Sequence, residues 1–246
     1  MFVASIRKLT GKHRTRGANI SLGLLLAAIA GAINAGGFLA IGQYTSHMTG
    51  MLSAVADYIA LNKLYTAFIS LGFVFSFILG AASSAIIINW ARSRQFHSEF
   101  ALALMLEAIL LLLFGIVASG GMQHDFELSV NLTITLLCYI MGLQNAIITK
   151  ISNSEIRTTH ITGLSTDVGI EIGKIFYFWG SHNKNVKISI YKLALFSGLI
   201  FAFLIGGIMG ALAFKNFGYI TTTPIALLLV IIASVPIFDD LTGRKF

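Results

Sequence analysis

Two short polar motifs contain the residues of this sequence best suited to contact a small solute. The first, TSHMTG, occupies residues 45–50, and the second, TTHITG, occupies residues 158–163. Each follows a long apolar run that contains an Asn-Ala pair. In hydrocarbon an unsatisfied polar group costs several kcal/mol, so such residues are tolerated only where they are buried in protein or line a cavity. The residues that we expect to form a polar centre are Asn34, Thr45, Ser46, His47, Thr49, Asn145, Thr158, Thr159, His160 and Thr162.

The chain is expected to break before each motif and to start a new helix within it. The glycine pair at 36–37 weakens the first helix, and the hydroxyl of Thr45 or Ser46 can cap the next one. Free amides and the positive end of the helix dipole then favour an anion or a carbonyl oxygen. Thr158 and Thr159 can do the same in the second copy. Alternatives stay open for both residue types. The asparagines can simply hydrogen-bond neighbouring helices together, and the histidines can stabilise the fold, carry a proton or bind a metal ion.

Asp167 and Glu171 extend the second motif along one helical face. At about 100° per residue, both fall within about 40° of His160. The first copy lacks this polar stripe, because Ala54 and Tyr58 occupy the equivalent positions. The difference predicts that the two ends of a pathway are chemically different. An amphipathic helix facing water would carry the same stripe, so this alternative also remains.

Glu107 lies near the middle of the apolar run ALALMLEAILLLLFGIVA. A charged side chain at the centre of a membrane helix costs about 2.5–3.5 kcal/mol on insertion scales, and such residues are commonly functional. We expect Glu107 either to bind a coupling proton or cation, or to be protonated and hydrogen-bonded inside the helix bundle.

The composition excludes a soluble protein. Of the 246 residues, 56% are hydrophobic and only 11% are charged, and the mean hydropathy is +0.84, well above the values of soluble domains. The net charge of +7 comes from basic residues that lie between apolar runs, so we assign it to membrane topology and expect no nucleic-acid partner. The single cysteine, Cys138, lies in an apolar run and indicates neither a disulfide framework nor a Cys-rich metal site.

Six apolar runs are long enough to cross a hydrocarbon core of about 30 Å. They are residues 19–42, 64–90, 99–119, 128–150, 191–214 and 221–238. Two further helical segments, 46–62 and 160–178, are interrupted by polar residues. If neither of these two segments crosses the membrane, 15 of the 17 Lys and Arg residues lie on one side of it. If both segments cross, Lys and Arg are divided much more evenly between the two sides. Because Lys and Arg concentrate on the cytoplasmic side, we predict six transmembrane helices, two interrupted or re-entrant segments, and both termini in the cytoplasm.

The sequence also repeats internally. The Asn-Ala pairs match at an offset of 111 residues, the polar motifs at 113, and residues 72–85 match residues 198–211 at 126. With three crossings per half, the second half must be inverted relative to the first, as in many transporters and channels. Small residues at Gly80-x-x-x-Ser84 and Gly206-x-x-x-Gly210 take the same aligned positions and predict close helix packing. The expected fold class is an all-α integral membrane protein built as two inverted repeats (3+3).

The domain boundaries follow from this repeat. We expect a basic cytoplasmic N-terminus (1–18), a first membrane repeat (19–119), a short external loop (120–127), a second membrane repeat (128–238) and a cytoplasmic tail (239–246).

The stretch NAGGFLAIGQYTSHMTGML resembles the YoaK-type family of bacterial membrane proteins of unknown function, in which a similar Asn and Thr-Gly signature follows the first helix. The likeness extends over most of the chain, from about residue 19 to residue 237. It implies a multi-pass protein of roughly six helices in the bacterial inner membrane, but no substrate. The family's pattern falls on Asn34, Thr45, His47, Thr49 and Gly50 of this chain.

Together these features favour a transporter or channel for a small solute or ion, with a polar centre between two inverted halves. The alternatives are a non-transporting membrane partner or assembly subunit, and an intramembrane enzyme that uses His160 with Asp167 or Glu171. The sequence contains no Walker loop, no His-Glu-x-x-His and no Gly-x-Ser-x-Gly motif, so we expect neither an enzyme nor a cofactor. The expected partners are the lipid bilayer, the solute and, in a homo-oligomer, further copies of the chain.

Overall fold

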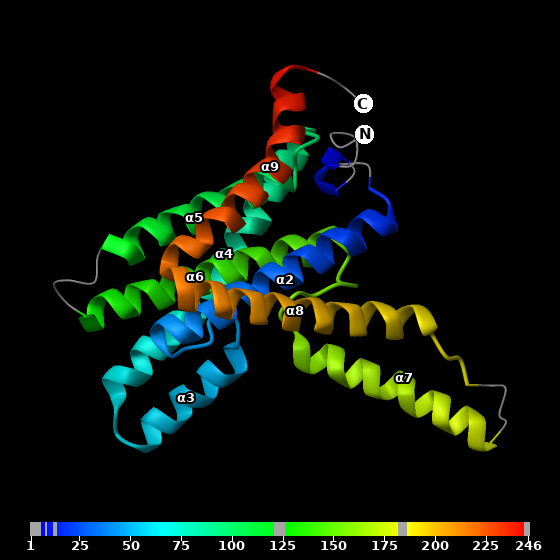
Figure 1. Ribbon diagram of the computed structural model, residues 1–246, viewed down its shortest axis with the longest axis horizontal. Coiled ribbons are helices and arrows are strands. Elements are labelled where there is room, and N and C mark those ends of the chain that lie inside the picture. Colours follow the sequence, from blue (N-terminus) through cyan, green and yellow to red (C-terminus); the bar gives the residue numbers. More distant parts are fainter. Residues whose placement is uncertain (1–5, 8, 12–13, 121–125, 182–185, 244–246) are drawn as a thin grey trace.

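The computed structural model describes residues 6–7, 9–11, 14–120, 126–181 and 186–243. Regular secondary structure in these residues is entirely helical (Figure 1), which confirms the all-α prediction. The helices are α2 (Arg16–Ile41), α3 (Met48–Ala60), α4 (Leu64–Ser93), α5 (Ala101–Gly120), α6 (Phe126–Ile151), α7 (Ile161–Ser181), α8 (Ile190–Phe217), the short 3-10 helix η1 (Gly218–Thr221) and α9 (Thr222–Leu241). Each α-helix agrees with its predicted segment to within three residues at both ends.

Four stretches of the described chain are long and apolar enough to cross a membrane. They are Arg16–Leu39, Leu64–Ser93, Leu128–Ile151 and Ile190–Leu241, the last of which contains α8, η1 and α9, and α5 adds the shorter apolar stretch Ala101–Ile116. Large apolar side chains such as Phe68, Phe75 and Phe201 are exposed on the outside of these helices. Extended exposed apolar surface is typical of contact with lipid. The chain is therefore a multi-pass membrane protein.

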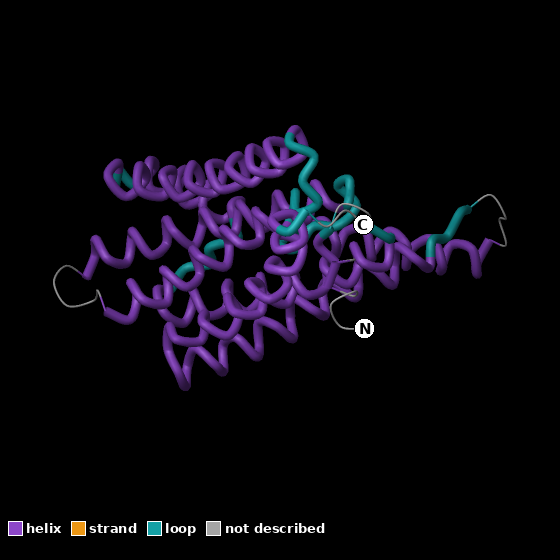
Figure 2. Tube along the Cα trace, turned by 90° about the horizontal axis from the view of Figure 1, so that it is seen from above, coloured by secondary structure: helices purple, strands orange, loops and turns teal. Residues whose placement is uncertain are grey.

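The helices associate mainly in three pairs: α2 packs along α8, α4 along α6, and α5 along α9. In Figure 1, α2 and α8 run side by side across the centre, and α5 and α9 lie together above them. Seen from above in Figure 2, the long helices lie roughly alongside one another. Fully buried apolar side chains from several helices fill the interior, among them Leu26 of α2, Leu104 of α5, Leu143 of α6 and Leu229 of α9. Each pair joins one helix from the first half of the chain to one from the second.

Glycines bring the backbones of two of these pairs into close contact. A Cβ atom at Gly80 of α4 would overlap the carbonyl oxygen of Tyr139 in α6. In the same way, a Cβ atom at Gly206 of α8 would overlap the carbonyl oxygen of Ala28 in α2. Gly80 and Gly206 are aligned in the sequence repeat, and so are Ala28 and Tyr139. The predicted small-residue packing is confirmed at equivalent places in both halves.

We expect Gly80→Val and Gly206→Val each to lower the thermal unfolding midpoint of the purified protein in detergent. Overpacking a tight core costs about 1–3 kcal/mol, and the obstacle here is backbone that a side-chain rotation cannot relieve. Gly72→Val in α4 is the matched control, since a Cβ atom there meets nothing within 4 Å. Equal midpoints for the Gly72 and Gly80 variants would contradict the close approach of α4 and α6.

The helices α3 and α7 begin near the middle of the molecule and point toward opposite ends (Figure 1). α2 stops at Gly42, whose φ of 70° is a left-handed conformation that favours glycine. The chain then turns back and starts α3 at Met48, and a comparable turn precedes the start of α7 at Ile161. α3 packs on α4, and α7 packs on α8. Both polar motifs thus lie at helix starts near the middle of the molecule, where His47 and His160 are exposed.

The two ends of the described chain meet at one end of the bundle. Nε and a terminal guanidinium nitrogen of Arg7 each lie 2.6 Å from a carboxylate oxygen of Asp239 near the end of α9. The Thr10 hydroxyl donates to the carbonyl oxygen of Ile232 at 3.1 Å, and Asp240 accepts from the backbone amides of His97 and Ser98 in the α4–α5 connection. These bonds fix the N-terminal segment, this connection and the end of α9 on the same side.

Candidate functional site

A cavity of about 570 Å³ lies between the two polar motifs. The polar side chains that line it are Ser46, His47, Thr49, Asn145, Thr149, Arg157, Thr159, His160, Thr162 and Thr166, and its apolar side chains include Phe77 and Ile161. All of the polar side chains except Thr149, Arg157 and Thr166 belong to the predicted polar centre. Cavities of roughly 300–1,000 Å³ with a few convergent polar groups are typical of small-ligand sites.

Each motif reaches the cavity because it forms the start of a helix. The prediction that Thr45 or Ser46 caps α3 is wrong, because the N-cap position is held by His47 and no described side chain caps the helix. The carbonyl oxygen of His47 accepts from the amide of Met51 at 3.2 Å. The carbonyl oxygen of His160 likewise accepts from the amide of Leu164 at 3.0 Å at the start of α7. The first amides of a helix have no partner within the helix. The starts of α3 and α7 both lie at this cavity.

The two asparagines hold these helix starts in place. Oδ1 of Asn34 accepts from the backbone amide of Ser46 at 3.1 Å and from its hydroxyl at 2.9 Å. Oδ1 of Asn145 accepts from the hydroxyls of Thr158 at 3.2 Å and Thr159 at 2.9 Å. One of these bonds is equivalent in the two halves, since the hydroxyls of Ser46 and Thr159 occupy matching positions. Asn145 lines the cavity, whereas Asn34 is buried and does not line it. Each asparagine thus joins a long helix to the broken segment that follows it.

The histidine rings fold back over the glycine that closes each motif. A Cβ atom at Gly50 would overlap Nδ1 of His47, and one at Gly163 would lie 2.8 Å from Nδ1 of His160. A side chain at either glycine would thus push the ring out of its place. This contact is a physical reason for the repeated His-x-Thr-Gly spacing.

Arg157 is a site residue that the sequence interpretation missed. Its guanidinium lies 3.2 Å from Nδ1 of His160. Because a guanidinium only donates, Nδ1 must be the acceptor, so His160 carries its proton on Nε2 when it is neutral. The equivalent position in the first motif is Tyr44, so this cation belongs to one half only. The sequence signal that could have identified Arg157 is its position immediately before the second motif.

Thr45 and Thr158 lie behind the cavity wall. Both are fully buried and occupy equivalent positions in the two motifs. The Thr158 hydroxyl bonds to Asn145, whereas Oγ1 of Thr45 has no hydrogen-bond partner among the described residues. These two threonines support the site without lining it.

Asp167 and Glu171 do not line the cavity. Asp167 is exposed on α7. Glu171 is buried and pairs with Lys174 at 2.7 Å, and its other oxygen accepts from the amide of Ser189 at 2.9 Å, immediately before α8. Glu171 therefore connects α7 to the start of α8, and the two acids do not act as one stripe facing the solute.

Glu107 lies in the protein interior and does not line the cavity. It is fully buried in α5, and its Oε1 accepts a 2.8 Å hydrogen bond from Nε2 of Gln144 in α6, which is also fully buried. Gln144 precedes Asn145, so the pair lies one residue away from the cavity lining. The sequence interpretation did not identify Gln144.

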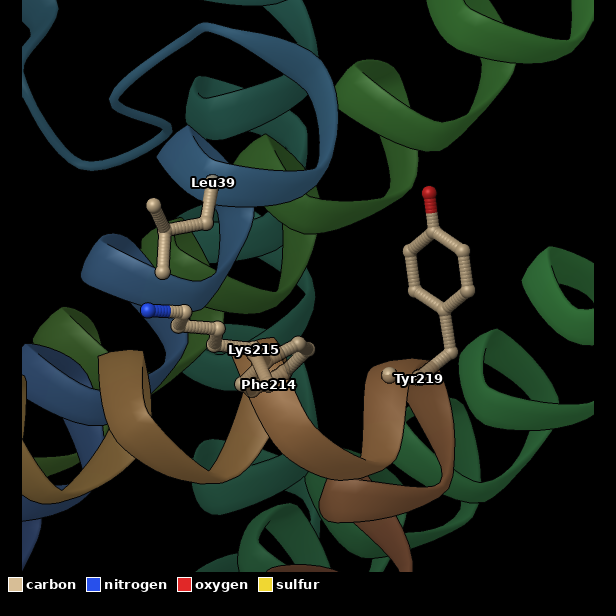
Figure 3. A pocket seen from close by; sticks show the side chains of 5 residues that line it. Leu39, Phe214, Lys215 and Tyr219 are labelled. Atoms are coloured by element: carbon tan, nitrogen blue, oxygen red, sulfur yellow. The ribbon is translucent and has the colours of Figure 1, made fainter.

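Two further cavities are smaller than the one between the motifs. One of about 190 Å³ lies under the first motif, against Tyr44, His47, Tyr58 and Phe73. The other, of about 300 Å³, lies at the junction of α8 and η1, where Leu39, Phe214, Lys215 and Tyr219 surround it (Figure 3). Within the described residues, His, Cys, Asp and Glu side chains form no group of three or more that could hold a metal ion.

Comparison with known proteins assigns the chain to a family. The family model described as "Protein of unknown function (DUF1275)" matches residues 22–235. The chain is 27% identical over 224 residues to the "UPF0700 transmembrane protein YoaK" of Bacillus subtilis (strain 168), covering 90% of this chain and 95% of that protein. No solved structure matches. The resemblance to the YoaK-type family is thereby confirmed.

Proposed function

Because the chain belongs to the DUF1275 family of proteins of unknown function, we propose its function from its own geometry. It carries a small solute or ion across the bacterial inner membrane, as a transporter or a channel. The observation that carries this proposal is the cavity that both polar motifs line together. Two copies of one motif, on helices that start near the middle of a membrane protein, provide a binding site that belongs to neither half alone.

In this proposal six helices cross the membrane, namely α2, α4, α5, α6, α8 and α9, while α3 and α7 enter and return. The two halves are inverted, with both termini in the cytoplasm. The packing supports this arrangement. In the sequence repeat α2 matches α6 and α8 matches α4, so the α2–α8 contact and the α6–α4 contact are the same contact in the two halves. The distribution of Lys and Arg along the chain supports it as well.

The solute that best fits the cavity is a small anion or a solute rich in carbonyl oxygens. Arg157 lines the cavity, and the described lining contains no Asp or Glu. Charge-assisted hydrogen bonds from a guanidinium are strong, and the N-termini of α3 and α7 add donors and a positive potential. We assign no enzymatic activity, because the acids that would accompany His160 lie outside the lining.

A vesicle swelling assay tests this proposal. Purified protein is reconstituted in liposomes and mixed with hyperosmotic formate, nitrate, phosphate, glycerol or urea, and solute entry is followed by light scattering. We expect at least one of the anions to enter faster than in protein-free vesicles and faster than the neutral solutes. Entry of none of the five solutes above the protein-free rate, with protein that is folded by gel filtration, would contradict the proposal.

Labelling of single cysteines tests the topology separately. We expect a cysteine at Lys63, between α3 and α4, to react with a membrane-impermeant maleimide from outside the cell. A cysteine at Lys187, between α7 and α8, should react only after the membrane is opened. Both positions are exposed in the fold, and Cys138→Ala removes the natural cysteine, which is buried. Labelling of both positions from the same side would exclude the inverted arrangement.

A further inference from the structure

Glu107 and Gln144 form a buried polar pair whose hydrogen bonding is incomplete. Neither side chain is exposed, and one bond joins them, from Nε2 of Gln144 to Oε1 of Glu107 at 2.8 Å. The two remaining oxygens, Oε2 of Glu107 and Oε1 of Gln144, are buried without a partner among the described residues. Both are acceptors, and both belong to the same pair.

A single proton on Glu107 would complete the pair. A protonated carboxyl group donates from one oxygen and accepts at the other, and an amide does the same with its nitrogen and oxygen. Oε2 of Glu107 would then donate to Oε1 of Gln144 while the existing bond runs in the opposite direction. One hydrogen atom would therefore serve both unpartnered oxygens, and it would make the side chain neutral, as a buried carboxyl without a cation requires. Two free oxygens are too few for a metal cation, which takes about six oxygen ligands.

Among the described residues, no charged side chain on the helices packed against α5 is free to replace this proton. The helices packed against α5 are α4, α6, η1 and α9. Tyr65 of α4 is exposed. The other described charged or titratable side chains on α4, α6 and α9 have other partners: Arg92 binds Glu99, Lys150 binds Asn89, Tyr139 binds Ser83, Cys138 lies against Met51, Asp239 binds Arg7 and Asp240 binds two backbone amides. Tyr219 of η1 packs edge-on against Phe114, seven residues beyond Glu107 on α5.

We infer that Glu107 is a proton-binding site of this protein and that its proton is coupled to the solute in the cavity. The connection is short, because Gln144 is adjacent in α6 to Asn145, which lines the cavity and holds the start of α7. Loss of the proton leaves a buried charge with one donor, which favours a shift of α6 against α5 that lets solvent reach Glu107. Such a shift moves Asn145 and the α7 start with it. The coupling rests on the proposed transport function, whereas the proton-binding site does not.

Infrared spectroscopy of the reconstituted protein tests the site itself. We expect wild-type protein at neutral pH to show the C=O stretching band of a protonated carboxyl group, which shifts in D₂O. Glu107→Gln should abolish this band. The exchanged pair, Glu107→Gln with Gln144→Glu, should restore it, because the acid and the amide only change places. Absence of the band in the wild type, or its persistence in Glu107→Gln, would overturn the proton-binding site.

The coupling is tested with whichever of formate, nitrate or phosphate enters the vesicles. An inward proton gradient should accelerate uptake by wild type and by the exchanged pair at least about fivefold, but should not accelerate uptake by Glu107→Gln. Equal acceleration in all three proteins would overturn the coupling. If no anion enters, the coupling falls with the proposed function, while the infrared band still decides whether Glu107 binds a proton.

Discussion

Replacing Arg157 with alanine should lower uptake of the transported anion by about 10- to 100-fold at low solute concentration. A hydrogen bond to a charged group contributes about 1.5–3 kcal/mol, and 1.4 kcal/mol corresponds to a factor of ten in affinity. Arg157 is the one basic side chain other than histidine in the described cavity lining. Its loss also removes the donor that faces Nδ1 of His160. The main effect should appear in the solute concentration required for half-maximal uptake.

Two further variants make the Arg157 result specific. Arg157→Lys keeps the charge but loses the planar set of donors, so its uptake should lie between wild type and Arg157→Ala. Lys215→Ala removes a cation that lies in the separate cavity of Figure 3, and its uptake should equal wild type. A loss of uptake in Lys215→Ala as large as in Arg157→Ala would mean that net charge, and not the site, controls transport.

The positions of the helices could be predicted because hydrocarbon leaves the chain little choice. Backbone amides in a membrane must bond within their own segment, so an apolar run of sufficient length becomes a helix. The breaks could be predicted for the same reason, since the two polar motifs could not continue an apolar helix. The close helix contacts could be predicted because Gly80 and Gly206 lie in small-residue motifs at aligned positions, and such motifs favour close helix packing.

The direction in which each side chain points could not be predicted. Periodicity gives angles between residues on one helix, but not the rotation of that helix against its neighbours. In α7 the face that carries Thr162 and Thr166 lines the cavity, while Glu171 is directed to Ser189 at the start of α8. Arg157 precedes the helix, where no periodicity applies. The pairing of Glu107 with Gln144 depends on how α5 packs against α6, which no local pattern encodes.

The second large effect is expected at the asparagines. Asn145→Ala should lower anion uptake by about 10- to 100-fold, because it removes the acceptor of two hydroxyl hydrogen bonds that contribute about 0.5–1.5 kcal/mol each. The start of α7 is then free to move away from the cavity. Asn34→Ala removes the acceptor of the amide and hydroxyl of Ser46 and should act in the same direction, with a smaller loss because Asn34 does not line the cavity. The folded amount in the membrane, measured by gel filtration, should remain close to wild type.

The structural cause of this loss can be separated from a direct contact with the solute. Thr159→Val removes one of the bonds that Asn145 accepts. If Asn145 acts by holding the helix start, the effects of Asn145→Ala and Thr159→Val should overlap, with an interaction energy of about 0.5 kcal/mol or more in a double-mutant cycle. Strict additivity of the two effects would instead assign Asn145 to the solute alone. The matched control is Asn131→Ala, which lies in α6 but outside the described cavity lining. If uptake by Asn131→Ala were as low as uptake by Asn145→Ala, any loss of an asparagine in this helix would disturb transport.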